Sequence, residues 1–374
     1  MAYKIALLHD YLNQYGGAER VLEALLEMFP EADLYTLFYD EKRMDGMFKK
    51  NIRKTSFLDL PFVRQYHRAF IPLMPFAAQT MTIDNDYDLI ISSSAGYAKG
   101  FNISHRHGHR PLHISYCHTP LRYAWESDYL EKLPGVLRFG RCMGGPIRSR
   151  LMAWDKKASE KVDVFIANSE FIRGKINTYY GREAEVVYPP VDTERFFFEE
   201  KPEKEYYLMA GRLIYYKRFD LGIQAARSMG RALKIAGIGP EEKNLRSIAK
   251  GAKNIEFLGR VPDSDLRKIY AEARGLIFPQ VEDFGLVAAE AQASGLPVIV
   301  YDRGGAKEIV EDKKTGVLFK EQSEEGVKKA IEEFEDTRFE RKYIAERAMR
   351  FSKDIFKNRI RKIINTKFPI SNFQ

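Results

Sequence analysis

The sequence predicts an α/β protein with two domains, each built on a parallel β-sheet. The chain has 374 residues, which is more than one ordinary hydrophobic core accommodates and favours two or three domains. Short runs of β-branched and aromatic residues alternate with amphipathic segments, the pattern of strands and helices in a parallel sheet. This alternation runs twice along the chain, and the pair Pro189-Pro190 interrupts it.

The first set of apolar runs predicts six strands, with a helix over Ala18–Phe29 between the first two. The expected strands are Lys4–His9, Leu34–Tyr39, Leu89–Ser93, Leu112–Cys117, Val164–Asn168 and Glu185–Tyr188.

The second set follows a charged stretch, Phe197–Glu205, which we interpret as a linker. Helices are expected over Val287–Ala293 and, in a basic tail, over Ile355–Ile364. The expected strands are Tyr206–Ala210, Leu233–Ala236, Ile255–Leu258, Leu276–Phe278, Val298–Tyr301 and Val317–Phe319.

Composition excludes several classes of protein. No apolar run approaches the roughly 20 residues that a membrane-spanning helix needs. The N-terminal strand meets polar residues too soon for a signal peptide. Only Cys117 and Cys142 occur, with no close pairing, so we expect free thiols in a reducing cytoplasm.

The formal net charge of +8 is concentrated between residues 42 and 75, where eight basic residues face two acidic ones. Aromatic and aliphatic residues are interleaved with them, a composition that an anionic membrane surface attracts. A solvated helix pair covering the N-terminal core explains the segment equally well. Nucleic-acid binding is not expected, because no recognition motif or stacking signature accompanies the charge.

The most informative stretch runs from Pro279 to Glu290. An apolar strand precedes it and a helix follows, so its Phe-Gly turn lies at a helix N-terminus, where unpaired N–H groups and the helix dipole favour an anion such as phosphate. Glu282 precedes this turn, and Glu290 lies about one and a half helical turns beyond it. Two acceptors on either side of an anion pocket suit a nucleotide sugar; two solvated surface glutamates are the alternative.

Two basic residues that could serve such a pocket follow the strand Tyr206–Ala210. They are Arg212, directly after Gly211, and Lys217. Ligands of open α/β sheets bind at the carboxyl ends of strands, so both cations are positioned to neutralise a diphosphate. Asp84 and Asp86 offer a competing site, since paired carboxylates hold divalent ions. They precede the strand Leu89–Ser93, however, which puts them at the opposite edge of the sheet.

Two features of the first half also suggest a site. Gly16 and Gly17 open the first helix, where glycines let the backbone approach a ligand closely. The full dinucleotide-binding pattern is absent, and a tight turn is the simpler alternative. His118 ends the strand Leu112–Cys117 before Pro120, although a lone histidine is more often structural.

Glu282 and Glu290, with Phe284-Gly285 between them, resemble the Glu-x7-Glu signature of the retaining glycosyltransferases of family four. The segments 291–299 and 304–310 also match that family, and the resemblance is strongest from about Tyr206 to Phe319. It implies the GT-B fold: two Rossmann-like domains facing a cleft, with a last helix that crosses back to the first domain. The expected divisions are 1–190 for the acceptor, 191–352 for the donor, and 353–374 for that helix.

The resemblance also assigns roles to residues. Glu282 and His118 would position the donor sugar, Arg212 and Lys217 would bind its phosphates, and Glu290 would hold the ribose. Further contacts to the donor would come from Gly16, Gly17, Val261, Phe284, Gly285 and Leu286. No metal ion, cofactor or covalent nucleophile is expected. The acceptor would attack from the face that the phosphate leaves.

The expected function is transfer of a hexose from a nucleotide-diphosphate sugar to a glycan or lipid-linked glycan. The sequence around Cys117-His118-Thr119-Pro120 resembles mannosyltransferases of cell-surface polysaccharide and lipopolysaccharide synthesis, which indicates GDP-mannose. The protein is expected in the cytoplasm, peripheral on the inner face of the membrane, in an oligomeric state that the sequence leaves open. The alternatives are an epimerase or phosphorylase of the same architecture and a basic membrane- or nucleic-acid-binding module.

Overall fold

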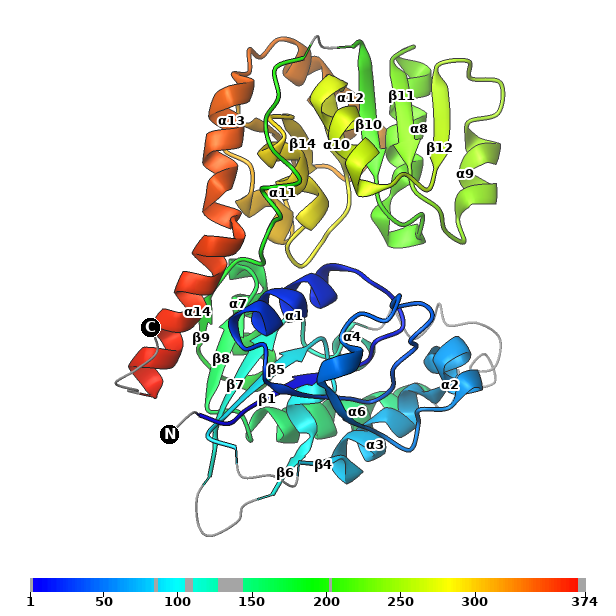
Figure 1. Cartoon of the computed structure of the whole chain (residues 1–374). Coiled ribbons are helices and arrows are strands. Elements are labelled where there is room, and N and C mark those ends of the chain that lie inside the picture. The colour runs from blue at the N-terminus through cyan, green and yellow to red at the C-terminus, as the bar shows by residue number, and fades with distance from the viewer. Residues whose placement is uncertain (1–2, 84–86, 105–109, 127–143, 202–203, 369–374) are drawn as a thin grey trace. The chain divides into compact units, whose positions relative to one another are not determined.

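The computed structural model describes residues 3–83, 87–104, 110–126, 144–201 and 204–368 (Figure 1). The chain divides into two compact units. Unit 1 comprises Met1–Tyr188 and Lys357–Gln374, and unit 2 comprises Pro189–Phe356. None of the helices in the described ranges is both long and apolar enough to cross a membrane.

Unit 1 is built on a parallel sheet of seven strands in the order β3-β2-β1-β5-β7-β8-β9. The strands are β1 (Ile5–His9), β2 (Asp33–Thr36), β3 (Ile52–Thr55), β5 (Leu89–Ser94), β7 (Leu112–Cys117), β8 (Val164–Ala167) and β9 (Ala184–Val186). A separate pair joins β4 (Thr82–Ile83) to β6 (Asn102–Ile103). The helices are α1 (Gly17–Met28), α2 (Pro61–Tyr66), α3 (Met74–Thr80), α4 (Arg122–Trp125), α6 (Gly144–Ser159) and α7 (Glu170–Tyr180), with 3₁₀ turns η1 (Lys49–Asn51), η2 (His67–Leu73) and η3 (Ala98–Gly100).

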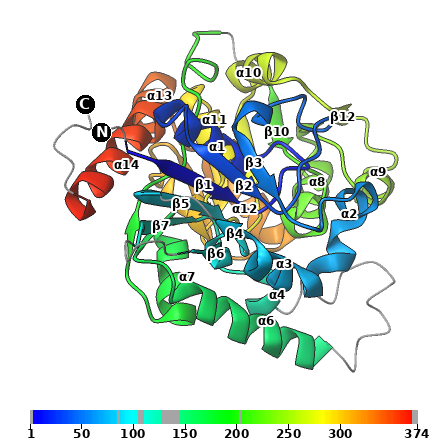
Figure 2. The same ribbon diagram turned by 60° about the horizontal axis from the view of Figure 1, so that its bottom comes forward.

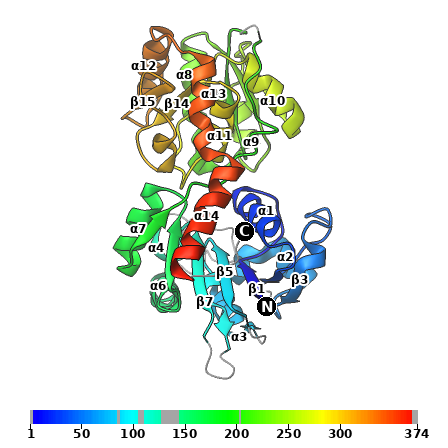
Figure 3. The same cartoon turned by 60° about the vertical axis from the view of Figure 1, so that its left-hand side comes forward.

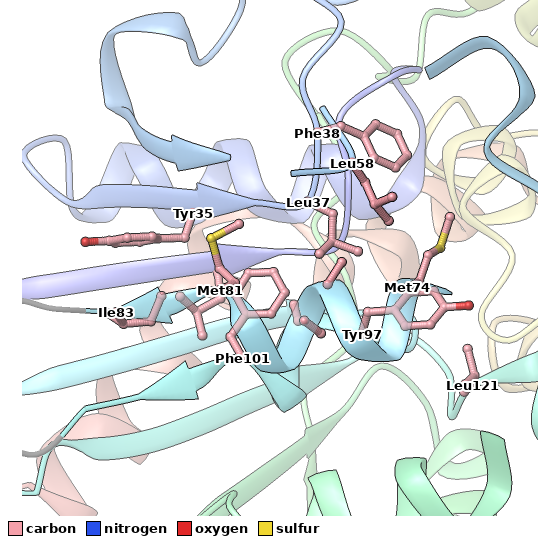
Figure 4. Close-up of a cluster of buried hydrophobic side chains, with 14 of the residues drawn as sticks. Tyr35, Leu37, Phe38, Leu58, Met74, Met81, Ile83, Tyr97, Phe101 and Leu121 are labelled. Carbon is pink, nitrogen blue, oxygen red and sulfur yellow. The ribbon is translucent and has the colours of Figure 1, made fainter. Parts of the chain in front are cut away.

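The central strands of unit 1 are buried on both faces, as parallel sheets require. Every residue of β5 is buried. Figure 2 shows α1 on one side of the sheet and α3 and α6 on the other. The core on the α3 side includes Tyr35, Leu37, Met81 and Phe101, which point into one cluster in Figure 4. Burial on both faces explains the apolar runs Ala6–Leu8 of β1 and Leu89–Ile91 of β5.

Unit 2 has a six-stranded parallel sheet in the order β12-β11-β10-β13-β14-β15. The strands are β10 (Tyr206–Ala210), β11 (Ala232–Ala236), β12 (Ile255–Gly259), β13 (Gly275–Phe278), β14 (Val298–Tyr301) and β15 (Gly316–Phe319). The helices are α8 (Phe219–Ser228), α9 (Glu242–Ile248), α10 (Asp263–Glu272), α11 (Leu286–Ala293), α12 (Glu324–Glu335) and α13 (Arg341–Ala348), with 3₁₀ turns η5 (Tyr215–Lys217), η6 (Gly305–Glu308) and η7 (Met349–Phe351).

The last helix, α14 (Lys353–Lys367), belongs to unit 1 from Lys357 onward. Figure 3 shows it beside α1, and an ion pair of 2.6 Å joins Lys357 Nζ to Glu27 Oε2 of that helix. On its inner side Ile360, Ile363 and Ile364 are buried. An amphipathic face and one ion pair therefore hold the end of the chain to the N-terminal sheet.

The predicted α/β class and the parallel sheets are confirmed, but some predicted boundaries are wrong. The strand expected to reach Tyr39 leaves the sheet after Thr36. The residues that follow β2 run beside the loop after β1, where Leu12 N–H donates to Phe38 O at 2.9 Å. The stretch interpreted as a linker starts within unit 2, where the Arg267 guanidinium lies 4.4 Å from the Phe197 ring.

Candidate active site

The strand order of each unit reverses at one place, and ligands of open α/β sheets bind at the carboxyl ends of the strands there. In unit 2 the reversal lies between β10 and β13. The loop after β10 carries Arg212 and Lys217, and the loop after β13 carries Glu282. Predicted residues that are about 70 positions apart in the sequence therefore lie on adjacent loops.

Lys217 and Glu282 form an ion pair. The distance from Lys217 Nζ to Glu282 Oε1 is 2.7 Å, and the two side chains are 14% and 15% exposed. The lysine extends along Gly211, since a Cβ added there would lie 3.4 Å from Nζ. Because both groups are largely withdrawn from water, each charge is neutralised mainly by the other. Arg212 is exposed on the same loop.

Glycines let the loops of this edge pass in direct contact. A Cβ on Gly237, after β11, would lie 1.8 Å from Gly211 O, and one on Gly305, after β14, would lie 2.1 Å from Asp283 O. Gly305 N–H donates to Glu282 O at 2.8 Å. The loop that carries Glu282 is thus fixed by a neighbouring glycine turn. This second turn lies in the segment 304–310, whose sequence resembles the family but does not reveal the contact.

Gly285 begins helix α11 with φ of +104°, a left-handed conformation that favours glycine. The N–H groups of the first turn that follows have no partner within the helix. The ring of Phe284 points away into the core, packing edge-on against Phe351 at 5.3 Å. Phe284 can therefore contact a ligand here through its backbone, whereas Leu286 is partly exposed and Glu290 is buried within the helix.

Val261 lies two residues after the end of β12, on the loop that follows Gly259, and it is partly exposed. Gly259 has φ of +69°, and its carbonyl accepts a 2.7 Å hydrogen bond from Gly237 N–H. The loop expected to contact the base is thus hydrogen-bonded to the loop after β11, whose Gly237 packs against Gly211. Within unit 2, each of the loops predicted for the donor therefore follows a strand of the sheet at its carboxyl edge.

In unit 1 the strand order reverses between β1 and β5. His118 lies one residue beyond the end of the neighbouring strand β7, and its Nε2 is 2.8 Å from Ser93 Oγ. Burial and the nearby His9 imidazole lower the pKa of His118 to about 3. The ring is therefore neutral at pH 7, with one N–H donor and one acceptor nitrogen. Next to it Thr119 is buried, and its hydroxyl has no hydrogen-bond partner in the ranges that the structure describes.

Gly16 is the residue before α1, and its N–H donates to Glu19 Oε2 at 2.8 Å. The glycine is extended, with φ of −153°, and Gly17 is the first helical residue. Glu19 was not predicted as a site residue, although a carboxylate three residues after a helix-capping position is a known cap signal. Ser93 and His9 were also missed, because their contacts join distant parts of the chain.

The metal alternative rested on Asp84 and Asp86, which lie outside the described residues. Cys142 lies outside them as well, and Cys117 is a buried free thiol. Within the described ranges no three histidine, cysteine, aspartate or glutamate side chains gather as a metal site would require.

Comparison with known proteins gives the family. Residues 15–195 match the family model described as Glycosyltransferase Family 4, and residues 190–351 match the one described as Glycosyl transferases group 1. The chain therefore carries two glycosyltransferase domains, a Family 4 domain followed by a group 1 domain, and its fold matches that of GT-B glycosyltransferase structures.

Similar structures cover nearly the whole chain. HepE from Anabaena, crystallised with UDP, has a TM-score of 0.70 at 17% identity and covers 97% of this chain and 100% of its own. Sucrose-phosphate synthase from Thermosynechococcus elongatus has a TM-score of 0.73 at 18% identity, covering 98% of this chain and 100% of its own. At these identities the likeness concerns the fold, and it confirms the predicted pair of Rossmann-like domains.

A GDP-mannose-dependent alpha-(1-6)-phosphatidylinositol monomannoside mannosyltransferase of Mycobacterium tuberculosis is 30% identical over 207 residues, 48% of this chain and 54% of the relative. A glycosyltransferase of Methanocaldococcus jannaschii without an assigned activity is 28% identical over 201 residues, 53% and 57% of the two chains. The chain spans about half the length of the curated relatives it matches.

Proposed function

We propose that the protein transfers a hexose from a nucleotide-diphosphate sugar to a glycan or lipid-linked glycan, with retention of configuration and without a metal ion. One observation carries the proposal. The Lys217–Glu282 ion pair, 2.7 Å long, lies on the loops that flank the strand-order reversal of unit 2. A cation and a carboxylate there match the two ends of the donor, its phosphates and its sugar hydroxyls.

In this proposal donor binding replaces the ion pair with two new ones. Lys217 turns to the diphosphate together with Arg212, and Glu282 accepts hydrogen bonds from sugar hydroxyls. The N–H groups of Gly285, which caps α11, and of Leu286, its first residue, donate to a phosphate oxygen beside the Phe284 backbone. Glu290 accepts from the ribose, and the loop at Val261 contacts the base.

The proposed reaction needs no covalent intermediate. The bond from the anomeric carbon to the phosphate oxygen breaks, and the acceptor oxygen forms the new bond on the same face. The acceptor proton passes to the departing phosphate. Arg212 and Lys217 stabilise the growing negative charge on the phosphate, and positioning supplies most of the remaining catalysis. His118, neutral at pH 7, would hold the sugar beside Gly16 and Gly17.

GDP-mannose is the first donor to test, because a relative with 30% identity carries that dependence in its name. UDP-glucose is the competitor, because HepE was crystallised with it. A ligand that binds the folded state alone raises the unfolding midpoint, so a thermal-shift screen of nucleotide sugars ranks the donors. Transfer is then measured with the best donor and a glycan acceptor. If none of the nucleotide sugars shifts the midpoint, the proposed function is wrong.

We also propose that unit 1 docks on an anionic membrane, where a lipid-linked acceptor is presented. Support comes from exposed basic and aromatic side chains on and around α2, η2 and α3; the two helices are labelled in Figure 1. Its exposed residues are Phe57, Phe62, Tyr66, Leu73, Phe76, Lys50, Arg53 and Arg68. Phe62 and Phe76 are 53% and 58% exposed, whereas Ile71 and Met74 are buried in the core and take no part.

Vesicle sedimentation tests the docking. Each basic residue near an anionic surface contributes on the order of 1 kcal/mol, so binding to anionic vesicles should exceed binding to neutral ones and fall with salt. The variant Arg53→Gln with Phe76→Ser should release the protein. Lys250→Gln with Met349→Ser, matched exposed positions of unit 2, should not. Equal, negligible binding to both vesicle types would contradict docking and favour a soluble acceptor.

A further inference from the structure

A line of buried polar side chains joins the Gly16 turn to His118 within unit 1. Glu19 Oε1 lies 3.5 Å from His9 Nε2. His9 Nδ1 lies 3.1 Å from Ser93 Oγ, which in turn lies 2.8 Å from His118 Nε2. The four side chains come from α1, from the ends of β1 and β5, and from the residue after β7.

The sheet fixes the spacing of this line. His9 and Ser93 are register partners in the parallel ladder between β1 and β5. His118 N–H donates to Ser94 O at 2.9 Å, and its carbonyl accepts from Asn168 Nδ2 at 2.9 Å. All four side chains are buried, so their polar atoms must find partners within the protein.

Donors and acceptors in the line can be assigned from its charged end. An ionised carboxylate only accepts, so Glu19 favours the proton of His9 on Nε2. When Nε2 carries the only ring proton of His9, the other nitrogen, Nδ1, accepts from the Ser93 hydroxyl. A hydroxyl that donates one hydrogen bond can still accept another. The Ser93 oxygen, which donates to His9, therefore accepts the hydrogen bond that His118 Nε2–H donates.

We propose that Glu19, His9 and Ser93 are positioning residues that hold His118 in the tautomer protonated at Nε2. Its Nδ1 is left as an acceptor, the nitrogen available to a hydroxyl of the bound sugar. The sugar contact rests on the proposed function, whereas the tautomer does not. His118 is thereby coupled to the Gly16 turn, whose N–H occupies the other oxygen of Glu19.

The tautomer is measured directly by nitrogen NMR of the wild-type protein labelled with ¹⁵N-histidine, near pH 7.5 and without ligand. Protonated and bare ring nitrogens have well-separated shifts, and the signal lost in His118→Gln identifies the residue. We expect the proton on Nε2. A proton found on Nδ1 overturns the proposal without any further variant.

The matched variants are Ser93→Ala and Ser92→Ala. Ser92 is the preceding residue of β5, equally buried, and its hydroxyl contacts His113 Nε2 at 3.0 Å instead. Because side chains alternate along a strand, Ser92 faces the other side of the sheet. Ser93→Ala should shift the His118 nitrogen signals and Ser92→Ala should leave them in place. Equal spectra for both variants would contradict the proposal.

Kinetics then test the consequence for transfer. Ser93→Ala should lower kcat on the order of tenfold, the effect of one net hydrogen bond, with KM for the donor changed less than about twofold. Ser93→Thr, which keeps the hydroxyl, should restore most of the loss. A wild-type Nε2–H tautomer in a protein that transfers no sugar would refute the proposed function while leaving the positioning proposal intact. Equal kcat for Ser93→Ala and Ser92→Ala would refute the positioning role.

Discussion

At the scale of single residues, the Lys217–Glu282 pair explains how two opposite charges can persist at the proposed donor site before a donor binds. Each side chain is about 15% exposed, so either charge alone would be poorly solvated. In the proposed complex a diphosphate would supply the lysine with a stronger partner, and sugar hydroxyls would then satisfy the carboxylate. The site is therefore stable when empty and still able to bind an anion.

Lys217→Ala should lower kcat/KM at least about 100-fold, because a charge-assisted contact to the leaving phosphate is lost. Stability should fall by only about 1 kcal/mol, from the unpaired Glu282. The control is Arg218→Ala, which removes the same charge one residue away, where Arg218 Nη2 instead binds Asp220 at 3.0 Å. Initial rates and urea unfolding of both variants are the measurements. Equal rates for the two variants would locate the phosphate pocket elsewhere.

Two buried histidines predict how stability depends on pH. Burial lowers the pKa of His113 to about 4 and, together with the nearby His9 imidazole, that of His118 to about 3. The unfolded chain takes up these protons near pH 6.5, so this stability is complete above that pH and is lost as pH falls toward 4. The buried Asp10, whose pKa is raised, acts in the opposite sense.

Urea unfolding of the wild type and of His113→Gln, compared at pH 7.5, 6 and 5, isolates one group. The wild type should lose up to about 1.4 kcal/mol per pH unit more than the variant over the acidic part of this range. Parallel pH curves for the two proteins would show that His113 is not buried as a neutral ring.

At the scale of elements, the site depends on glycine turns that bring backbone against backbone. Gly305→Ala would place a Cβ 2.1 Å from Asp283 O, in the loop that carries Glu282. We expect a loss of about 2 kcal/mol or more in stability, as for other strained backbone changes, together with loss of donor binding.

Gly174→Ala is the control. It is exposed in helix α7 with nothing within 4 Å, and it should stabilise by about 0.5–1 kcal/mol. Thermal unfolding and donor titration compare the two, and unchanged donor affinity in Gly305→Ala would contradict the tight crossing.

Most elements could be predicted from the sequence, for a physical reason. Strands buried on both faces are continuous apolar runs, as β10 and β14 are. The edge strand β3 was missed because it reads Ile-Arg-Lys-Thr, and charged residues are common on sheet edges. The short helices α2 and α3 flank a 3₁₀ segment with an internal proline, which obscures helical periodicity.

At the scale of the whole molecule, the sequence predicts which segments contribute to the candidate site. It does not predict which side chains from distant segments contact one another. Residues of the α11 motif are close in sequence, so their arrangement follows from local rules for helix starts. The contact of Ser93 with His9 spans 84 residues, and that of Lys217 with Glu282 spans about 65. Such pairs depend on strand order, which the pattern of single strands does not specify.

Metal independence is a prediction about the whole enzyme. Because Arg212 and Lys217 are assigned the charge that a divalent ion would supply, a chelator should leave the rate of transfer unchanged. Activity lost with chelator and restored by Mg²⁺ or Mn²⁺ would revive the site at Asp84 and Asp86. The assay is the same donor-plus-acceptor reaction, run with and without chelator.

Calorimetric titration of the best donor from the screen into the wild type and into Glu290→Gln tests directly whether α11 forms the donor site. If α11 forms the donor site, the variant should bind more weakly by about 1.5–3 kcal/mol, the value of a hydrogen bond to a charged group. Gln292→Leu is the control, because Gln292 is buried on the same helix but binds Thr315 O at 3.0 Å. It should lose stability and keep its donor affinity. Equal affinity in the wild type and Glu290→Gln would contradict the account.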